Sequence, residues 1–180
     1  MATKAQRDHL WIQVVLGDIR PKLIKLGMYL PPNNMTVAVV DKEEMSRLLK
    51  RPVGHVTGLT VSHGWQYNMD HHIYVLDSLR PCSFKETLAH ECGHVWLNDR
   101  NSYLIHQSRQ EVEGFCNLVA YKVLLFEFSE EAKRVRKSML ENPDPIYGEG
   151  FRIMKQRADN EGWDNFLYRL SGEGEYGELW

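Results

Sequence analysis

The sequence predicts an α+β fold, with a small sheet and helices in the first part of the chain and a mainly helical second part. Two observations predict it. Short β-branched and apolar runs, the pattern of buried strands, lie between residues 36 and 76. Beyond them, apolar residues recur at helical spacing behind helix-capping residues. We expect one domain: an N-terminal helical region (1–35), strands plus a helix containing "HECGH" (36–100), and a helical part (101–180).

The first elements follow in chain order. Residues 5–28 are expected to be helical but interrupted at Pro21, which is suited to the first turn of a second helix. The segment "TVAVV" (36–40) predicts a buried strand. Asp41, with Glu44 three residues later, predicts the start of a short helix through a capping-box-like arrangement.

Two more strands and the central helix come next. "VTGLTVS" (56–62) alternates as a strand does, and a further strand is expected around "IYVL" (73–76). Ser83 and Glu86 form an S-x-x-E capping box, so we expect the following helix to begin near Phe84.

The remaining segments predict helices. "EVEGFCNLVAYKVLLFEF" (111–128) is amphipathic, and Ser129 is placed to cap a charged helix after it. "ENPDP" (141–145) marks the clearest break in the chain. Two last helices are expected near 151–160 and in "WDNFLYRL" (163–170).

Composition excludes several classes of protein. The hydrophobic fraction of 43% and charged fraction of 26% are those of a globular domain, and 180 residues suffice to enclose a core. A net charge of -2 with interspersed signs predicts neither nucleic-acid nor membrane binding. The longest apolar runs are too short to span a bilayer. Three cysteines without a CxxC pair, and an N-terminus without a signal-peptide pattern, indicate a cytoplasmic protein. The oligomeric state is left open.

The central helix carries an H-E-x-x-H motif. On a helix, His90 and His94 share one face about 6 Å apart, so both imidazoles can bind one metal ion. Glu91 then lies beside a water held by that ion, where it can act as a base. The predicted buried stripe of this helix, which contains Leu88 and Cys92, is a neighbouring one. The motif therefore predicts a zinc site.

Catalytic zinc usually takes three protein ligands and one water, so a third ligand is needed. The candidates are Glu111, Glu113, His106 and Asp99. Glu113 opens the second amphipathic helix beside its apolar face, and ligands from two facing helices are a common construction. The alternative for Glu113 is an acid favoured by the helix dipole in the first turn, and for Glu111 this is the better interpretation.

Three motifs together carry a resemblance. "LAHECGHVWL" (88–97), "VEGFCN" (112–117) and "PIYGEGFR" (145–152) occur in the order found in the peptidase domain of the plant DA-one family. That family comprises ubiquitin-activated zinc metallopeptidases that limit organ growth. The resemblance covers roughly residues 56–170 and is more specific than the metal motif alone.

The resemblance implies a gluzincin-like fold and a set of roles. His90 and His94 would be zinc ligands, Glu91 the catalytic base and Glu113 the third ligand. The first glutamate of the family's pair falls on Val112 here, so the family gives no ligand role to its neighbour at 111. Cys92–Gly93 replaces a methionine pair and Asn117 a glutamine. The chain has no LIM or ubiquitin-binding segment, so ubiquitin regulation is not inherited.

The sequence thus predicts a zinc-dependent metallopeptidase acting on an intracellular protein or peptide substrate, with Zn²⁺ as its cofactor. Tyr147 and Arg152 are candidates for stabilising the oxyanion, and the alternative is that their segment is a glycine-shaped turn packed on the core. The "IYVL" strand is either a sheet edge that binds an extended peptide or an interior strand. The alternative function is a protein-binding module that zinc stabilises without catalysis.

Overall fold

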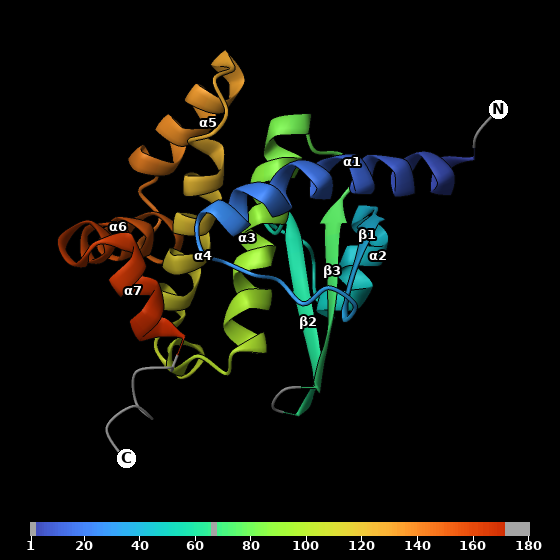
Figure 1. The fold of residues 1–180 in the computed structure, drawn as a ribbon. Helices are drawn as coiled ribbons and strands as arrows, with labels where there is room; N and C mark the ends of the chain where they lie inside the picture. Colours follow the sequence, from blue (N-terminus) through green and yellow to red (C-terminus); the bar gives the residue numbers. More distant parts are fainter. Residues whose placement is uncertain (1–2, 66–67, 172–180) are drawn as a thin grey trace.

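A computed structural model describes residues 3–65 and 68–171, and within them the fold is α+β (Figure 1). A three-stranded sheet lies beside a group of helices. The elements in chain order are α1 (Lys4–Lys25), β1 (Met35–Val40), α2 (Lys42–Leu49), β2 (Gly58–Trp65), β3 (Asn68–Leu76), α3 (Pro81–Asp99), a 3₁₀ turn η1 (Tyr103–His106), α4 (Arg109–Leu124), α5 (Glu130–Glu141), a π-helical turn η2 (Pro145–Glu149), α6 (Gly150–Glu161) and α7 (Trp163–Leu170). Residues 172–180 of the predicted helical part lie outside the described residues.

The sheet is mixed, with strand order β1-β3-β2. β1 runs parallel to β3, pairing Met35 with His71, and β2 runs antiparallel to β3, pairing Gly58 with Val75. The "IYVL" segment (73–76) therefore lies in the central strand. Our edge alternative for it is wrong, because β3 has a hydrogen-bonded neighbour on both sides. The edges of this sheet are β1 and β2.

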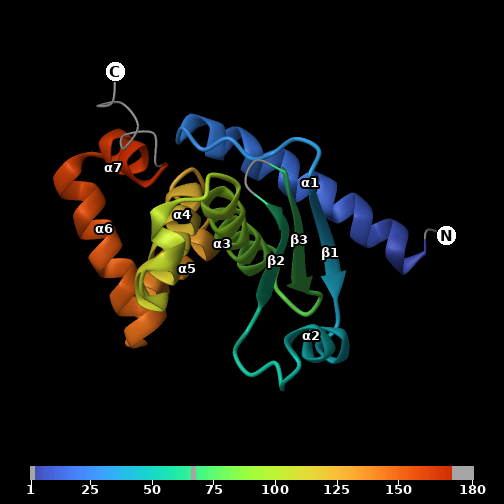
Figure 2. The same ribbon diagram turned by 90° about the horizontal axis from the view of Figure 1, so that it is seen from below.

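The sheet has helices on both faces (Figure 2). Ile73 and Val75 of β3 point into the main core together with side chains of α1 and α3. Leu76 packs on the other face against Met45 of α2 and Val53. The main core continues from the sheet through α3 into α4, α6 and α7, so α3 stands between the sheet and the C-terminal helices.

Two predicted helix boundaries in this part of the chain are wrong. α1 continues through Pro21, although a proline in a helix interior removes a hydrogen bond and costs about 3 kcal/mol. Ile19 and Leu23 on either side are fully buried, and their packing holds the helix together across the gap. α3 begins at Pro81, not Phe84, because proline suits the first helical position. Its N-cap residue makes no side-chain cap, so the predicted capping box does not form.

Other helix ends follow local chemistry. The side chain of Asp41 accepts a hydrogen bond from the Glu44 N–H, and Ser129 caps α5, as predicted. α4 begins at Arg109, two residues earlier than expected, because Ser108 is its N-cap. It ends at residue 124, and α5 follows after a short connection. None of the helices in the described part of the chain is both long and apolar enough to cross a membrane.

Candidate metal centre

The H-E-x-x-H motif lies on α3, which presents one half-buried stripe away from the core. Between residues 86 and 98 every side chain is buried except Glu86, His90, His94 and Asn98, which follow one another at intervals of four. We call these four residues the open stripe. The predicted buried stripe is confirmed, since Leu88 is fully enclosed. Both histidines are thus held by a packed helix and remain accessible.

The predicted third ligand completes a triangle of donor atoms. The His90 Nε2 lies 3.1 Å from the Glu113 Oε2 and 3.2 Å from the His94 Nε2, and the His94 Nε2 lies 3.5 Å from the Glu113 Oε2. Ligand atoms about 2.0–2.1 Å from one zinc ion at the tetrahedral angle are about 3.3–3.4 Å apart. The three separations in the structure match this spacing. The donor set of two imidazoles and one carboxylate also suits zinc.

Glu113 reaches the histidines because α4 packs directly against α3 (Figure 1). A Cβ placed on Gly93 of α3 would be 3.1 Å from both the Cα and the Sγ of Cys116 on α4. Glycine in a helix interior costs about 1 kcal/mol relative to alanine. At Gly93 the packing of α3 against Cys116 of α4 offsets this cost. The same contact places the first turns of α4 opposite the motif.

Asn117 orients His90, the first candidate ligand, a role that our sequence reasoning missed. Its Oδ1 lies 2.8 Å from the His90 Nδ1, and its Nδ2 donates to the Tyr147 carbonyl at 2.8 Å. Because an amide oxygen only accepts, this contact fixes a proton on the His90 Nδ1 and turns Nε2, the nitrogen that would bind a metal ion, toward Glu113. The available signal was an amide one helical turn after Glu113, where the resembling family has glutamine.

The electrostatics favour an ionised carboxylate between the two imidazoles. Burial opposes the charge, but hydrogen bonds with His90 and His94 lower the pKa of Glu113 well below its usual range. Burial also disfavours a positive charge on His90. The hydrogen bond with Glu113 and the negative charge of Glu91 outweigh this effect of burial, so the pKa of His90 is raised. Arg109, 3.7 Å from the other oxygen of Glu113, adds a positive charge.

Cys116 is a second candidate for the third ligand. Its Sγ and the two imidazoles lie within 4.8 Å of one another. Two observations favour Glu113. Its Oε2 lies 3.1 and 3.5 Å from the two imidazoles, and burial together with the charges of Glu113 and Glu91 raises the pKa of the Cys116 thiol well above its usual value. Cys116 faces Gly93 and serves the helix contact.

Glu91 is buried beside the site on the side of the sheet. Its side chain is 5% exposed, and the Thr60 hydroxyl of β2 donates to its Oε2 at 2.7 Å. The other oxygen, Oε1, abuts Gly58, where an added Cβ would come within 2.5 Å of it. Glycine at position 58 therefore leaves space next to Oε1. Thr60 and Gly58 were not recognised from the sequence, because their role depends on the pairing of β2.

Tyr147 and Arg152 occupy different places. The Tyr147 hydroxyl accepts a hydrogen bond from Arg109 at 2.9 Å, and burial followed by the charge of Glu113 raises the pKa of Tyr147. Tyr147 thus belongs to the surroundings of the donor triangle. The Arg152 guanidinium donates to the carbonyls of Leu140 and Asn142, at 3.3 and 2.8 Å. Arg152 thereby supports the turn that carries Tyr147.

The glycines of the two downstream motifs bring those motifs together. A Cβ on Gly114 of α4 would be 2.3 Å from the Gly150 carbonyl oxygen, and one on Gly150 would be 2.3 Å from the Gln110 carbonyl oxygen. A Cβ on Gly148 would be 2.0 Å from the Asn142 oxygen. We call these contacts the glycine junction. Through them "VEGFCN" and "PIYGEGFR" meet backbone to backbone.

The other ligand candidates have different partners. Glu111 pairs with Arg157 at 2.7 Å, which together with the Ser108 hydrogen bond lowers its pKa in spite of partial burial. Asp99 ends α3 and lies 3.8 Å from the His71 Nε2. His106 ends the turn η1.

Comparison of the chain with protein-family models, curated protein sequences and solved structures finds no match. The functional argument consequently rests on the motifs and on the geometry described above.

Proposed function

We propose that this chain is a zinc-dependent metallopeptidase of the gluzincin type, which hydrolyses peptide bonds in a cytoplasmic protein or peptide substrate. The observation that carries the proposal is the triangle of His90, His94 and Glu113, whose separations of 3.1, 3.2 and 3.5 Å suit one tetrahedral zinc ion. Three unpaired cysteines are consistent with a reducing compartment.

Each residue of the site has a distinct task in this proposal. Bound zinc would supply a Lewis acid that polarises the scissile carbonyl and lowers the pKa of a water to about 7. Glu91 takes the proton of that water and passes it to the leaving amine. Thr60 holds one oxygen of Glu91, which leaves Oε1 beside Gly58 for the proton. The Tyr147 hydroxyl is the candidate donor to the developing oxyanion.

The edge strand β2 is the proposed site of the peptide backbone. The Leu76 N–H donates to the Thr57 carbonyl at 3.0 Å, and hydrogen-bonded residues alternate along an antiparallel pair. The backbone groups of Gly58, Thr60 and Ser62 accordingly point away from β3. An extended peptide adding to this edge would run beside the open stripe, since Thr60 contacts Glu91 of the same helix.

One observation favours the alternative, a zinc-stabilised binding module without catalysis. Glu91 is 5% exposed and hydrogen-bonded to Thr60, as a purely structural carboxylate would be. The open stripe and a donor set of three, which leaves one zinc position vacant for water, favour the peptidase.

Zinc content is the first test, measured by elemental analysis of the purified chain. We expect one zinc per wild-type chain and much less in Glu113→Ala. Glu111→Ala is the matched control, because it removes a glutamate from the same helical turn that pairs with Arg157 instead. Cys116→Ala should retain zinc if Glu113 is the ligand. Absence of zinc from folded, zinc-supplemented wild type would refute the proposal.

Glu91→Gln separates the two functions. We expect this variant to retain zinc and to lose peptide cleavage, because the amide cannot accept the proton of the water. Cleavage is measured with a fluorogenic peptide library. No cleavage by zinc-loaded wild type across the library would favour the binding module. An unchanged rate of cleavage in Glu91→Gln would mean that Glu91 is not the base.

A further inference from the structure

Glu86 lies on the open stripe of α3, one helical turn before His90. Residues four apart on a helix are about 6 Å apart at Cβ, so the Glu86 side chain is adjacent to the first ligand. Substrate bound at the metal centre beside this stripe would come within reach of Glu86. The proposed mechanism gives this carboxyl group no task.

Within the described part of the chain, the Glu86 carboxylate has no hydrogen bond and no ion pair. Other partly buried acids nearby are paired: Glu113 with the two histidines and Glu127 with Lys22 and Lys85. Burial raises the pKa of Glu86, and the positive charge of His90 only partly opposes this. Of the described carboxyl groups with a resolved shift, Glu86 alone has a raised pKa.

Neither the helix dipole nor capping accounts for Glu86 in α3. α3 begins at Pro81, so Glu86 is in the second turn of the helix, beyond the region where the helix dipole favours acids. The predicted capping box, which would have used its side chain, does not form. A half-buried carboxylate without a partner is unfavourable, and a cation placed beside it removes that cost.

We propose that Glu86 determines substrate specificity by binding a cationic nitrogen of the substrate next to the metal centre. The inference rests on the proposed peptidase function and names its substrate class: peptides with a positive charge close to the scissile bond. The charge has two possible sources, a Lys or Arg side chain or the free α-amino group of a peptide, and both present N–H donors to a carboxylate.

Binding of peptide hydroxamates, which chelate zinc, tests the proposal without requiring turnover. The full, zinc-loaded chain is titrated calorimetrically with pairs of hydroxamates carrying lysine or uncharged norleucine at each position near the chelating group. In the wild type we expect the lysine compound to bind about tenfold tighter at one position. In a second set of hydroxamates the N-terminus is free or acetylated. If acetylation, and not the exchange of lysine for norleucine, weakens binding, the source of the charge is an α-amino group.

Two substitutions assign the preference to Glu86. Glu86→Gln should bring the ratio of the lysine and norleucine affinities to about one, and Glu86→Lys should favour a glutamate-bearing compound. Glu111→Gln, which removes a negative charge away from the open stripe, should leave the ratio unchanged. These ratios compare ligands on one variant, so a mere loss of stability does not alter them.

The outcomes are separable. Zinc and hydroxamate binding in the wild type without any preference for a positive charge, or a preference that persists in Glu86→Gln, overturns the assignment of Glu86 alone. A wild type that binds neither zinc nor hydroxamate overturns the proposed function and this inference with it.

Discussion

The two sides of the candidate centre are built in different ways. On the α3 side, helical periodicity alone places His90 and His94, and packing of the buried residues between them fixes the helix. On the α4 side, Glu113 and Asn117 of α4 and Tyr147 of η2 come from two segments that meet at the glycine junction. Two of the proposed ligands are therefore placed locally, whereas the proposed third ligand and its supports depend on backbone contacts between distant parts of the chain.

The largest expected effect comes from breaking the glycine junction with Gly114→Ala. Its Cβ would lie 2.3 Å from the backbone oxygen of Gly150, which no rotamer change relieves. We expect the free energy of unfolding, measured with urea, to fall by at least about 3 kcal/mol, together with loss of zinc.

Gly17→Ala is the matched control in α1. An added Cβ there meets nothing within 4 Å, and alanine in a helix interior stabilises by up to about 1 kcal/mol. Equal urea midpoints for Gly114→Ala and wild type would show that the junction is not under steric constraint.

The second prediction removes the Tyr147 hydroxyl from the α4 side. If this hydroxyl donates to the oxyanion, Tyr147→Phe lowers kcat about 100-fold and leaves zinc content unchanged. The control is Tyr168→Phe, a tyrosine that is 56% exposed on α7. Steady-state cleavage of a fluorogenic peptide measures both. A change in KM alone, with kcat preserved, would assign Tyr147 to binding rather than to the reaction.

The same comparison explains what the sequence could predict. Helices, strands and the α3 ligands depend on periodicity, and their prediction succeeded for the strand at 36–40 and for the helix capped by Ser129. Glu113 was selected as the third-ligand candidate because it opens the facing helix, and the structure brings it to the histidines.

The failures have tertiary causes. Pro21 stays inside α1 because neighbouring side chains are buried, and local rules contain no information on burial. Asn117 and Thr60 were missed because their partners lie about 30 residues away in the chain. "IYVL" had two possible places in the sheet, and only the parallel pairing with β1 decides between them.

The third prediction tests the support of His90 from α4. Asn117→Ala removes the hydrogen bond that fixes the His90 tautomer, so zinc affinity should fall between about 10- and 100-fold while the three ligands remain. Asn98→Ala is the control, since this asparagine of the open stripe bonds Ser62 instead. Competition with a chromophoric chelator gives both affinities. Equal affinities would mean that packing alone orients His90.

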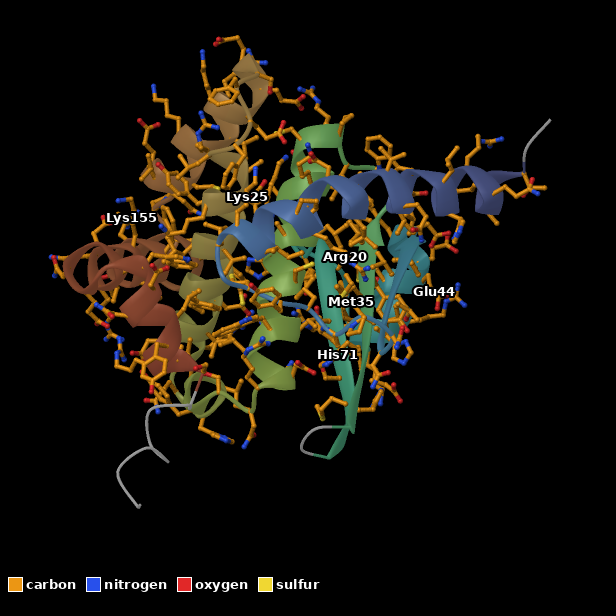
Figure 3. All side chains as sticks on the ribbon, in the orientation of Figure 1. Arg20, Lys25, Met35, Glu44, His71 and Lys155 are labelled. Carbon is orange, nitrogen blue, oxygen red and sulfur yellow. The ribbon has the colours of Figure 1, made fainter. Side chains whose placement is uncertain are left out.

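The smallest expected effect lies at the far end of the α3 side, where α3 meets the sheet. His71 of β3 (Figure 3) is 1% exposed, and its Nδ1 lies 2.8 Å from the Ser62 Oγ. Its Nε2 has no hydrogen-bond partner among the described residues and lies 3.8 Å from Asp99. Burial lowers the pKa of His71 although Asp99 opposes the shift.

This lowered pKa makes stability depend on pH. The unfolded chain, with a histidine pKa of about 6.5, takes up the proton before the folded protein does. Stability contributed by neutral His71 is therefore complete above pH ~6.5 and is lost as the pH falls toward the folded pKa, by at most about 1.4 kcal/mol per pH unit. The free energy of unfolding in urea is measured at two pH values, one above and one below the pKa of a free imidazole. On going to the lower pH, His71→Gln should lose less of this free energy than wild type. His55→Gln, an exposed histidine, should behave as wild type, and equal losses in all three proteins would mean that His71 does not couple folding to pH.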